Sequence, residues 1–136
     1  MKKSFLICIL FIQSYFGFSQ FNVGSTLNEA KTEISGYYTG IEISEEYLEE
    51  IESITLRYTL LESEILDYFK NNICYLEVII PQKTSAYNEW IKMFNEVLQK
   101  DGENKWISNR DGKNTIFECS YWKKKDINIF RIYQIE

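Results

Sequence analysis

Apolar and polar residues alternate along much of this chain, with a period of two in most segments. The clearest case is residues 54–60, where apolar and polar side chains alternate at every position, as in a strand with one buried face. Residues 65–70 and 73–80 are two further β-like runs, joined by an Asn-Asn pair that tolerates the positive φ angles of a tight turn. These segments predict a meander that ends at Pro81, because proline has no amide hydrogen to donate.

Two other stretches show the spacing of three and four that is typical of amphipathic helices. The first covers residues 25–35; it begins with a capping-box pattern, Thr26 followed by Glu29, and Gly36 is its expected end. In the second, residues 85–100, the apolar positions fall on one helix face. These positions are Tyr87, Trp90, Ile91, Phe94, Val97 and Leu98. Each helix is therefore expected to lie against the sheet.

The remaining segments complete a repeated order of elements. Residues 105–109, 114–122 and 127–135 are predicted as three more strands, whereas 37–43 is interpreted as an irregular strand and 42–53 as an acidic insertion of unassigned structure. The order α-β-β-β-α-β-β-β predicts an α+β fold, an antiparallel sheet with two helices packed on one face. It indicates an architectural duplication; the alternative is that hairpins of this composition simply look alike.

The start of the chain has the pattern of a secretory signal peptide. Two lysines precede the apolar run 5–12, and the small-x-small triplet 17–19 follows it. A membrane-spanning helix needs about 20 mostly apolar residues, roughly twice the length of this run. We therefore assign residues 1–19 to a signal peptide and 20–136 to a single exported α+β domain, periplasmic or extracellular, with no membrane insertion after cleavage.

Charge and histidine content narrow the function classes. Cleavage removes two of the 15 basic residues and none of the 20 acidic ones, so the net charge changes from −5 to about −7. Such a balance repels nucleic acids and anionic lipids and favours a basic protein partner from the envelope or the extracellular space. The chain contains no histidine, which excludes Ser-His and Cys-His catalysis and every histidine-containing metal site. We expect no enzyme activity, no metal and no cofactor.

Two cysteines of the exported domain are candidates for a disulfide. By alternation, Cys74 shares a strand face with Leu76, Val78 and Ile80, and Cys119 shares one with its own apolar neighbours. An oxidising compartment favours a bridge worth about 2–4 kcal/mol. The alternative is two free thiols that pack like small hydrophobic residues.

Candidate partner-binding residues fall in the acidic insertion and at two tryptophans. The insertion carries Glu45, Glu46, Glu49 and Glu50, which are interpreted either as a solvated surface or as a docking patch for a basic partner. Trp106 and Trp122 each lie near the end of a short predicted strand; exposed, they could contact a partner or stack on a sugar ring, and the alternative is that they cover the sheet.

The segment Gly24-Ser25-Thr26-Leu27-Asn28-Glu29-Ala30, followed by Ile34 and Gly36, resembles the helix start of the SmpA/OmlA and β-lactamase-inhibitor-protein-like folds. The resemblance implies short helices on antiparallel strands and a role in envelope assembly or protein inhibition. The signal ending, with the Lys, Ile, Asn and aromatic bias, also resembles small exported proteins of Bacteroidetes of unknown function.

These observations predict a secreted or periplasmic, non-catalytic protein-interaction module. The alternative is a small carboxylate-dependent hydrolase or carbohydrate-binding domain, which would need two carboxyl groups about 5–10 Å apart in a cleft beside one of the two tryptophans. A purely structural role in the envelope is a third hypothesis.

Overall fold

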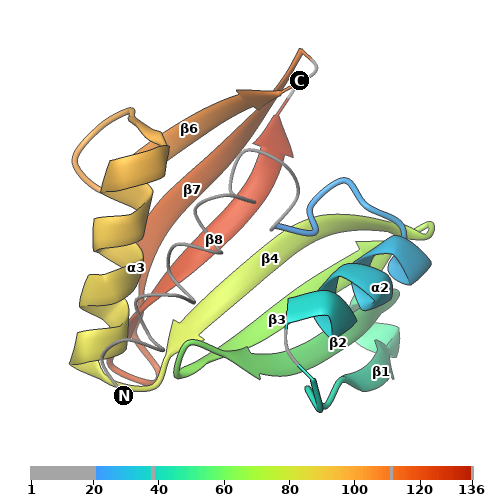
Figure 1. The fold of residues 1–136 in the computed structure, drawn as a ribbon. Coiled ribbons are helices and arrows are strands. Elements are labelled where there is room, and N and C mark those ends of the chain that lie inside the picture. The colour runs from blue at the N-terminus through green and yellow to red at the C-terminus, as the bar shows by residue number, and fades with distance from the viewer. Residues whose placement is uncertain (1–20, 38, 111, 136) are drawn as a thin grey trace.

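The computed structural model describes residues 21–37, 39–110 and 112–135, so the predicted signal peptide lies outside the described residues. Within them, two α-β-β-β-β units follow one another (Figure 1). The first unit consists of α2 (Leu27–Tyr37), β1 (Ser44–Leu48), the short 3-10 helix η1 (Glu49–Ile51), β2 (Ser53–Leu60), β3 (Ser63–Lys70) and β4 (Ile73–Pro81). The second consists of α3 (Thr84–Val97), β5 (Gln99–Lys100), β6 (Lys105–Arg110), β7 (Lys113–Trp122) and β8 (Ile127–Ile135).

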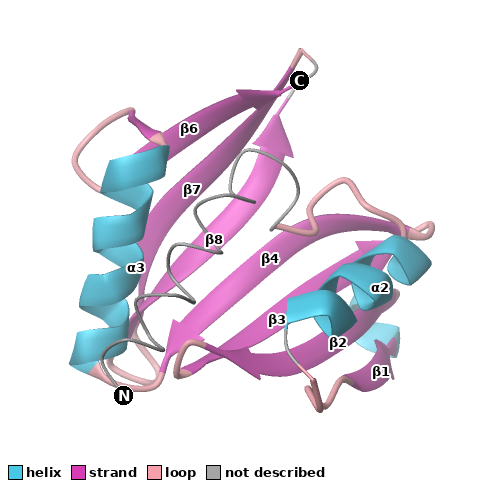
Figure 2. Ribbon diagram, viewed as in Figure 1, coloured by secondary structure: helices cyan, strands magenta, loops and turns pink. Residues whose placement is uncertain are grey.

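All eight strands form one antiparallel sheet with the order β1-β2-β3-β4-β8-β7-β6-β5 (Figure 2). The last strand of each unit pairs with the other at the centre, and the remaining strands extend outward in mirrored order. The α+β prediction is therefore confirmed. The mirrored order also agrees with the architectural duplication that the repeated pattern indicated.

Both helices lie on one face of the sheet. Phe94 of α3 makes an edge contact with Phe130 of β8, with ring centroids 5.1 Å apart. Phe130 is the register partner of Ile79 on β4, and both side chains belong to the hydrophobic core that also contains Ala30 and Ile34 of α2. The main core thus fills the space between the two helices and one face of the sheet.

Two local predictions are confirmed in atomic detail. The capping box begins α2, because the Thr26 amide donates to Glu29 Oε1 (3.3 Å) and the Glu29 amide donates to Thr26 Oγ1 (3.2 Å). Asn71 and Asn72 have φ angles of 53° and 64° and form the turn between β3 and β4. Both signals are short-range, so the sequence alone sufficed to find them.

The segment between α2 and β2 differs from the prediction. α2 continues through Gly36 to Tyr37, and residues 39–43 form no strand. Residues 44–48, assigned to an acidic insertion, instead form β1 at the edge of the sheet. An edge strand that buries neither face has no alternating pattern, which is why periodicity did not find it.

The second helix is shorter than predicted. α3 ends at Val97, and Leu98 already has an extended backbone with φ −115° and ψ 157°. Gln99 and Lys100 then pair with β6 as the short edge strand β5. Apolar spacing persists to residue 98, but pairing with the sheet determines where the helix stops.

A β-bulge in β4 changes the face on which Cys74 lies. Tyr68 is opposite Leu76 but Phe69 is opposite Cys74, so β4 carries one extra residue at this point. Cys74 therefore shares the helix-covered face with Glu77, and the prediction that it shares a face with Leu76 and the later aliphatic residues is wrong. An alternating sequence pattern cannot reveal a bulge, because the extra residue places the side chains before and after it out of phase with each other.

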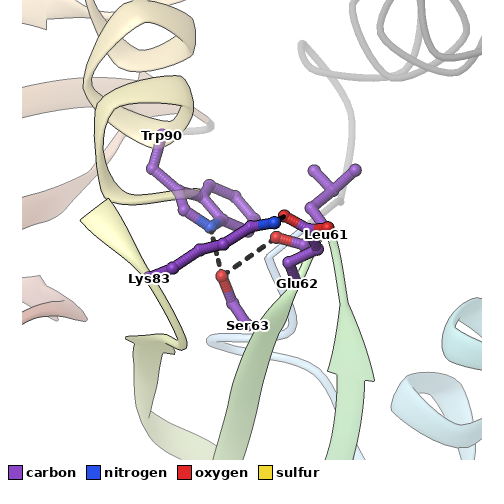
Figure 3. A network of polar contacts seen from close by, with 5 residues as sticks. All are labelled: Leu61, Glu62, Ser63, Lys83 and Trp90. Atoms are coloured by element: carbon purple, nitrogen blue, oxygen red, sulfur yellow. Dashed lines mark hydrogen bonds and ion pairs between the residues drawn. The ribbon is translucent and has the colours of Figure 1, made fainter. Parts of the chain in front are cut away.

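A polar network fixes the turn between β2 and β3 to α3 (Figure 3). Leu61 and Glu62 form this turn with φ angles of 51° and 53°, a conformation that residues other than glycine rarely adopt. Ser63 Oγ donates to the Leu61 carbonyl (3.1 Å) and accepts from Trp90 Nε1 of α3 (2.8 Å). Lys83 forms an ion pair with Glu62 across the same junction (2.9 Å). The turn is thereby held by the second unit.

Replacing Ser63 with alanine is expected to lower the free energy of unfolding by about 1–3 kcal/mol, because the buried indole N–H of Trp90 loses its acceptor. Urea denaturation followed by tryptophan fluorescence measures the loss. Ser63→Thr, which keeps the hydroxyl, is the matched control and should retain most of the stability. Equal stability of wild type and Ser63→Ala would contradict the role given to this bond.

Candidate functional site

The predicted glutamates lie at the outer edge of the sheet, on β1 and η1. Glu45, Glu46, Glu49 and Glu50 are all exposed. Glu45 forms an ion pair with Lys31 of α2, so its charge is partly neutralised. The other three project from the outermost strand and the short helix that follows it, where they are accessible to a partner.

Exposed apolar side chains lie beside these glutamates. Tyr75 and Ile51 expose 40% and 42% of their surface. Ser53 Oγ hydrogen bonds to Tyr75 Oη (2.8 Å) and donates to the Ile51 carbonyl (3.1 Å), which fixes Tyr75 next to η1. We call Glu46, Glu49, Glu50, Ile51 and Tyr75 the acidic edge.

The register explains how the acidic edge forms. Glu46 is opposite Thr55, Thr55 is opposite Tyr68, and the Tyr68 ring lies 6.4 Å from the ring of Tyr75. Glu46 therefore shares the sheet face that α2 does not cover with this pair of tyrosines. The sequence analysis found the glutamates but missed Tyr75, because the bulge beside it obscures which way the side chain points.

The two tryptophans do not join this surface. Trp106 is only 1% exposed and donates from Nε1 to Asn95 Oδ1 of α3 (2.9 Å), so its prediction as a partner-binding residue is wrong. Trp122 is exposed, as the prediction required. It lies on β7, five strand positions from β1, a lateral distance of about 24 Å. Trp122 and the glutamates of β1 and η1 thus cannot form one compact site.

Cys74 and Cys119 are free thiols. They lie on β4 and β7, which β8 separates, so their strands are about 10 Å apart before any offset along the strands is added. A disulfide requires Cα atoms within about 7 Å. The hypothesis of an intramolecular bridge is therefore wrong. Cys119 Sγ instead hydrogen bonds to Tyr87 Oη of α3 (3.2 Å).

A second polar group, which the sequence analysis missed entirely, is buried under α2. Asp67 and Glu77 are opposite each other across β3 and β4 and are 0% and 1% exposed. Asp67 Oδ2 accepts a hydrogen bond from Asn22 Nδ2 (2.8 Å) and another from the Tyr58 hydroxyl (3.1 Å). The register therefore places the two carboxyl groups side by side on the covered face of the sheet.

Two carboxyl groups side by side in a buried site repel each other when both are charged, so one of them holds a proton at neutral pH. Burial raises the pKa of Glu77 well above its usual range, and the charge of Asp67 raises it further. Burial also raises the pKa of Asp67, while the hydrogen bonds that it accepts from Asn22 and Tyr58 lower it. Glu77 therefore holds the proton. Asp67 Oδ1 has no hydrogen-bond partner among the described residues, so it is free to accept a bond from this proton.

The surroundings of the carboxyl pair contain no compensating cation among the described residues: none of their ion pairs includes Asp67 or Glu77. Burial raises the pKa values of Tyr37, Tyr58 and Cys74, and the two acids raise them further. All three neighbours therefore stay uncharged at neutral pH. The pair carries a single negative charge in a site that excludes water.

The chain before α2 covers this pair. We call residues 21–25 the N-terminal strap. The Asn22 amide donates to Glu77 Oε2 (3.3 Å), and the Gly24 amide donates to the carbonyl of Cys74 (2.9 Å). The amide of Cys74 in turn donates to the carbonyl of the next strap residue (2.9 Å). The strap is thus bonded both to the backbone of β4 and to the buried acids.

The carboxyl pair does not match the geometry of the hydrolase hypothesis. Its two groups are opposite each other on adjacent strands and fully buried, instead of lying in an open cleft that a substrate can enter. The pair also does not lie beside Trp106. In the row that runs across the sheet from Glu77 to Trp106, Ile132 and Phe117 lie between them.

The described residues contain no group of three or more side chains able to hold a metal ion, and no helix long and apolar enough to cross a bilayer.

No protein-family model, curated protein or solved structure matches the chain. The resemblance to the SmpA/OmlA and β-lactamase-inhibitor-protein-like folds therefore stays a prediction.

Proposed function

We propose that the protein is an exported, non-catalytic interaction domain that binds a basic protein at the acidic edge. The observation that carries the proposal is the position of Tyr75 and Ile51, two exposed apolar side chains, beside three exposed glutamates of the outermost strand β1 and the short helix η1. Buried aromatic anchors contribute most of the affinity in protein interfaces, and surrounding charges speed the encounter and select the partner.

The edge position adds a second element of recognition. β1 pairs with β2 on one side only, so the backbone groups on its other side are available to an extended segment of a partner. An exposed edge strand invites aggregation, and negative charges on it are a common defence. A basic partner neutralises that defence, whereas a second copy of the same acidic edge is repelled. The charges thus favour a different protein over self-association.

The proposal predicts that Glu49→Lys/Glu50→Lys weakens binding. The tagged protein would be used to capture partners from the envelope fraction, and mass spectrometry would identify proteins retained at low salt and released at high salt. Reversing two charges at the acidic edge should weaken capture by at least about tenfold. Tyr75→Ala should also weaken it, because the anchor is lost while the charges remain.

A matched pair of charge reversals provides the control. Glu89→Lys/Glu103→Lys changes the net charge equally, but on α3 and in the turn before β6. This variant should capture the same proteins as the wild type, and circular dichroism should show all variants folded. Two outcomes would count against the acidic edge as the binding surface. One is capture that does not depend on salt, and the other is an equal loss of capture in both double variants.

A further inference from the structure

The N-terminal strap rests on two buried acids that together hold one proton. Asp67 and Glu77 belong to the β3–β4 ladder and cannot separate without breaking the sheet. The strap, in contrast, is joined to the β4 backbone by the bonds of Gly24 and Ser25 with Cys74, and its Phe21 and Val23 side chains pack against the core. Lifting the strap costs these bonds and apolar contacts but leaves the β3–β4 ladder intact, so it lets water reach the two carboxyl groups without breaking the sheet.

We propose that this proton is a latch for the N-terminal strap: the strap stays closed over Asp67 and Glu77 while the proton is bound and opens when the proton is lost. The latch is independent of the acidic edge and of any partner that binds there.

The geometry explains why losing the proton opens the strap. With both carboxyl groups ionised, two negative charges are side by side in a site without water. Among the described residues, the titratable groups that face the pair carry no positive charge: Tyr37 faces it from α2, where Glu33 adds a further negative charge, Tyr58 faces it from β2, and Cys74 lies beside it on β4. Opening the strap hydrates both charges.

The direction of the pH dependence follows from the pKa of Glu77, which is higher in the closed state than in the open state. Below the usual glutamate pKa of about 4.3, both states bind the proton and closure is fully favoured. Above it, the open state has lost the proton while the closed state keeps it. The open population then rises about tenfold per pH unit, equivalent to about 1.4 kcal/mol, until the closed-state pKa is reached.

Amide hydrogen exchange tests the latch on the purified protein between about pH 5 and pH 9. After correction for the intrinsic pH dependence of exchange, the protection of the Gly24 and Cys74 amides should fall about tenfold per pH unit. The Phe117 amide in β7 should keep its protection. Strap protection that does not change with pH overturns the proposal, and so does an equal fall at Phe117, because the proton would then stabilise the whole fold.

Glu77→Gln is the decisive variant. Its amide can donate to Asp67 and accept from the Asn22 amide at every pH, so it mimics the protonated state. Strap protection in this variant should be high and independent of pH. If Glu77→Gln does not fold, the pH dependence of the Gly24 and Cys74 amides relative to the Phe117 amide in the wild type remains the test, because Asp67→Asn would leave the buried Glu77 able to titrate. A pH-dependent loss of strap protection that persists in the folded isostere refutes the latch.

Discussion

Replacing Phe94 with alanine is expected to lower the free energy of unfolding by about 3–5 kcal/mol, the range typical of truncating a fully buried aromatic side chain. Phe94 is fully buried on α3 and packs against aromatic rings from four other parts of the chain as well as its own helix. These rings belong to Phe21, Trp90, Trp106, Phe117 and Phe130. Truncation leaves a cavity where the strap, the helix and the second unit meet.

Urea denaturation monitored by far-ultraviolet circular dichroism measures this loss. Phe94→Leu keeps much of the buried volume and should cost markedly less than alanine. Tyr47→Ala removes an aromatic ring of similar size from an exposed position on β1 and should change stability by less than about 0.5 kcal/mol. A cost below about 1 kcal/mol for Phe94→Ala would show that the packing around this ring is not as described.

Replacing Asp67 with alanine is expected to cost about 3–5 kcal/mol, because it leaves two buried donors without their acceptor. These donors are the Asn22 side-chain amide and the Tyr58 hydroxyl. The alanine also leaves a cavity under the strap, and the remaining polar groups would draw water into it.

Asp67→Asn separates the hydrogen bonds from the charge. Its carbonyl oxygen can accept from Asn22 and Tyr58, and its amide nitrogen can donate to Glu77, so its cost should be below about 1.5 kcal/mol. Thermal unfolding of both variants at one pH gives the comparison. Equal losses for alanine and asparagine would mean that the charge of Asp67, and not its hydrogen bonds, holds this region together.

The acidic edge and the buried carboxyl pair use acidic residues in opposite ways. Glu49 and Glu50 are hydrated, so their charges act outward on whatever approaches the sheet edge. Asp67 and Glu77 are buried away from water, so one of them must hold a proton. Their charge acts on the strap that covers them and not on an approaching partner. The first arrangement is suited to recognition and the second to coupling pH with local structure.

Most of the fold could be predicted from local patterns, because the central strands and both helices bury one face. Residues 54–60 alternate because β2 packs under α2, and the capping box at Thr26 begins a helix without help from the rest of the chain. The two missed strands are the edges, β1 and β5. An edge strand with no buried face carries no periodicity, and one of two residues is too short to show any.

The candidate site was predictable only where exposure follows from charge. Glu46, Glu49 and Glu50 belong to a run of glutamates too dense to be buried together, so their surface position was predictable, whereas the isolated Glu77 is buried. Tyr75 and Trp106 are amphipathic residues whose exposure depends on their neighbours: a bulge turns the first outward, and Asn95 completes a buried environment for the second.

The sequence by itself determined the α+β class, the order of the central elements, the tight Asn71-Asn72 turn and an acidic surface, since each depends on residues close together in the chain. Only the tertiary structure decided the strand order, the separation of Cys74 from Cys119 and the meeting of Asp67 with Glu77 under Asn22. These features depend on which strands pair and in which register. A single bulged residue changes that register without leaving a signal in the local pattern.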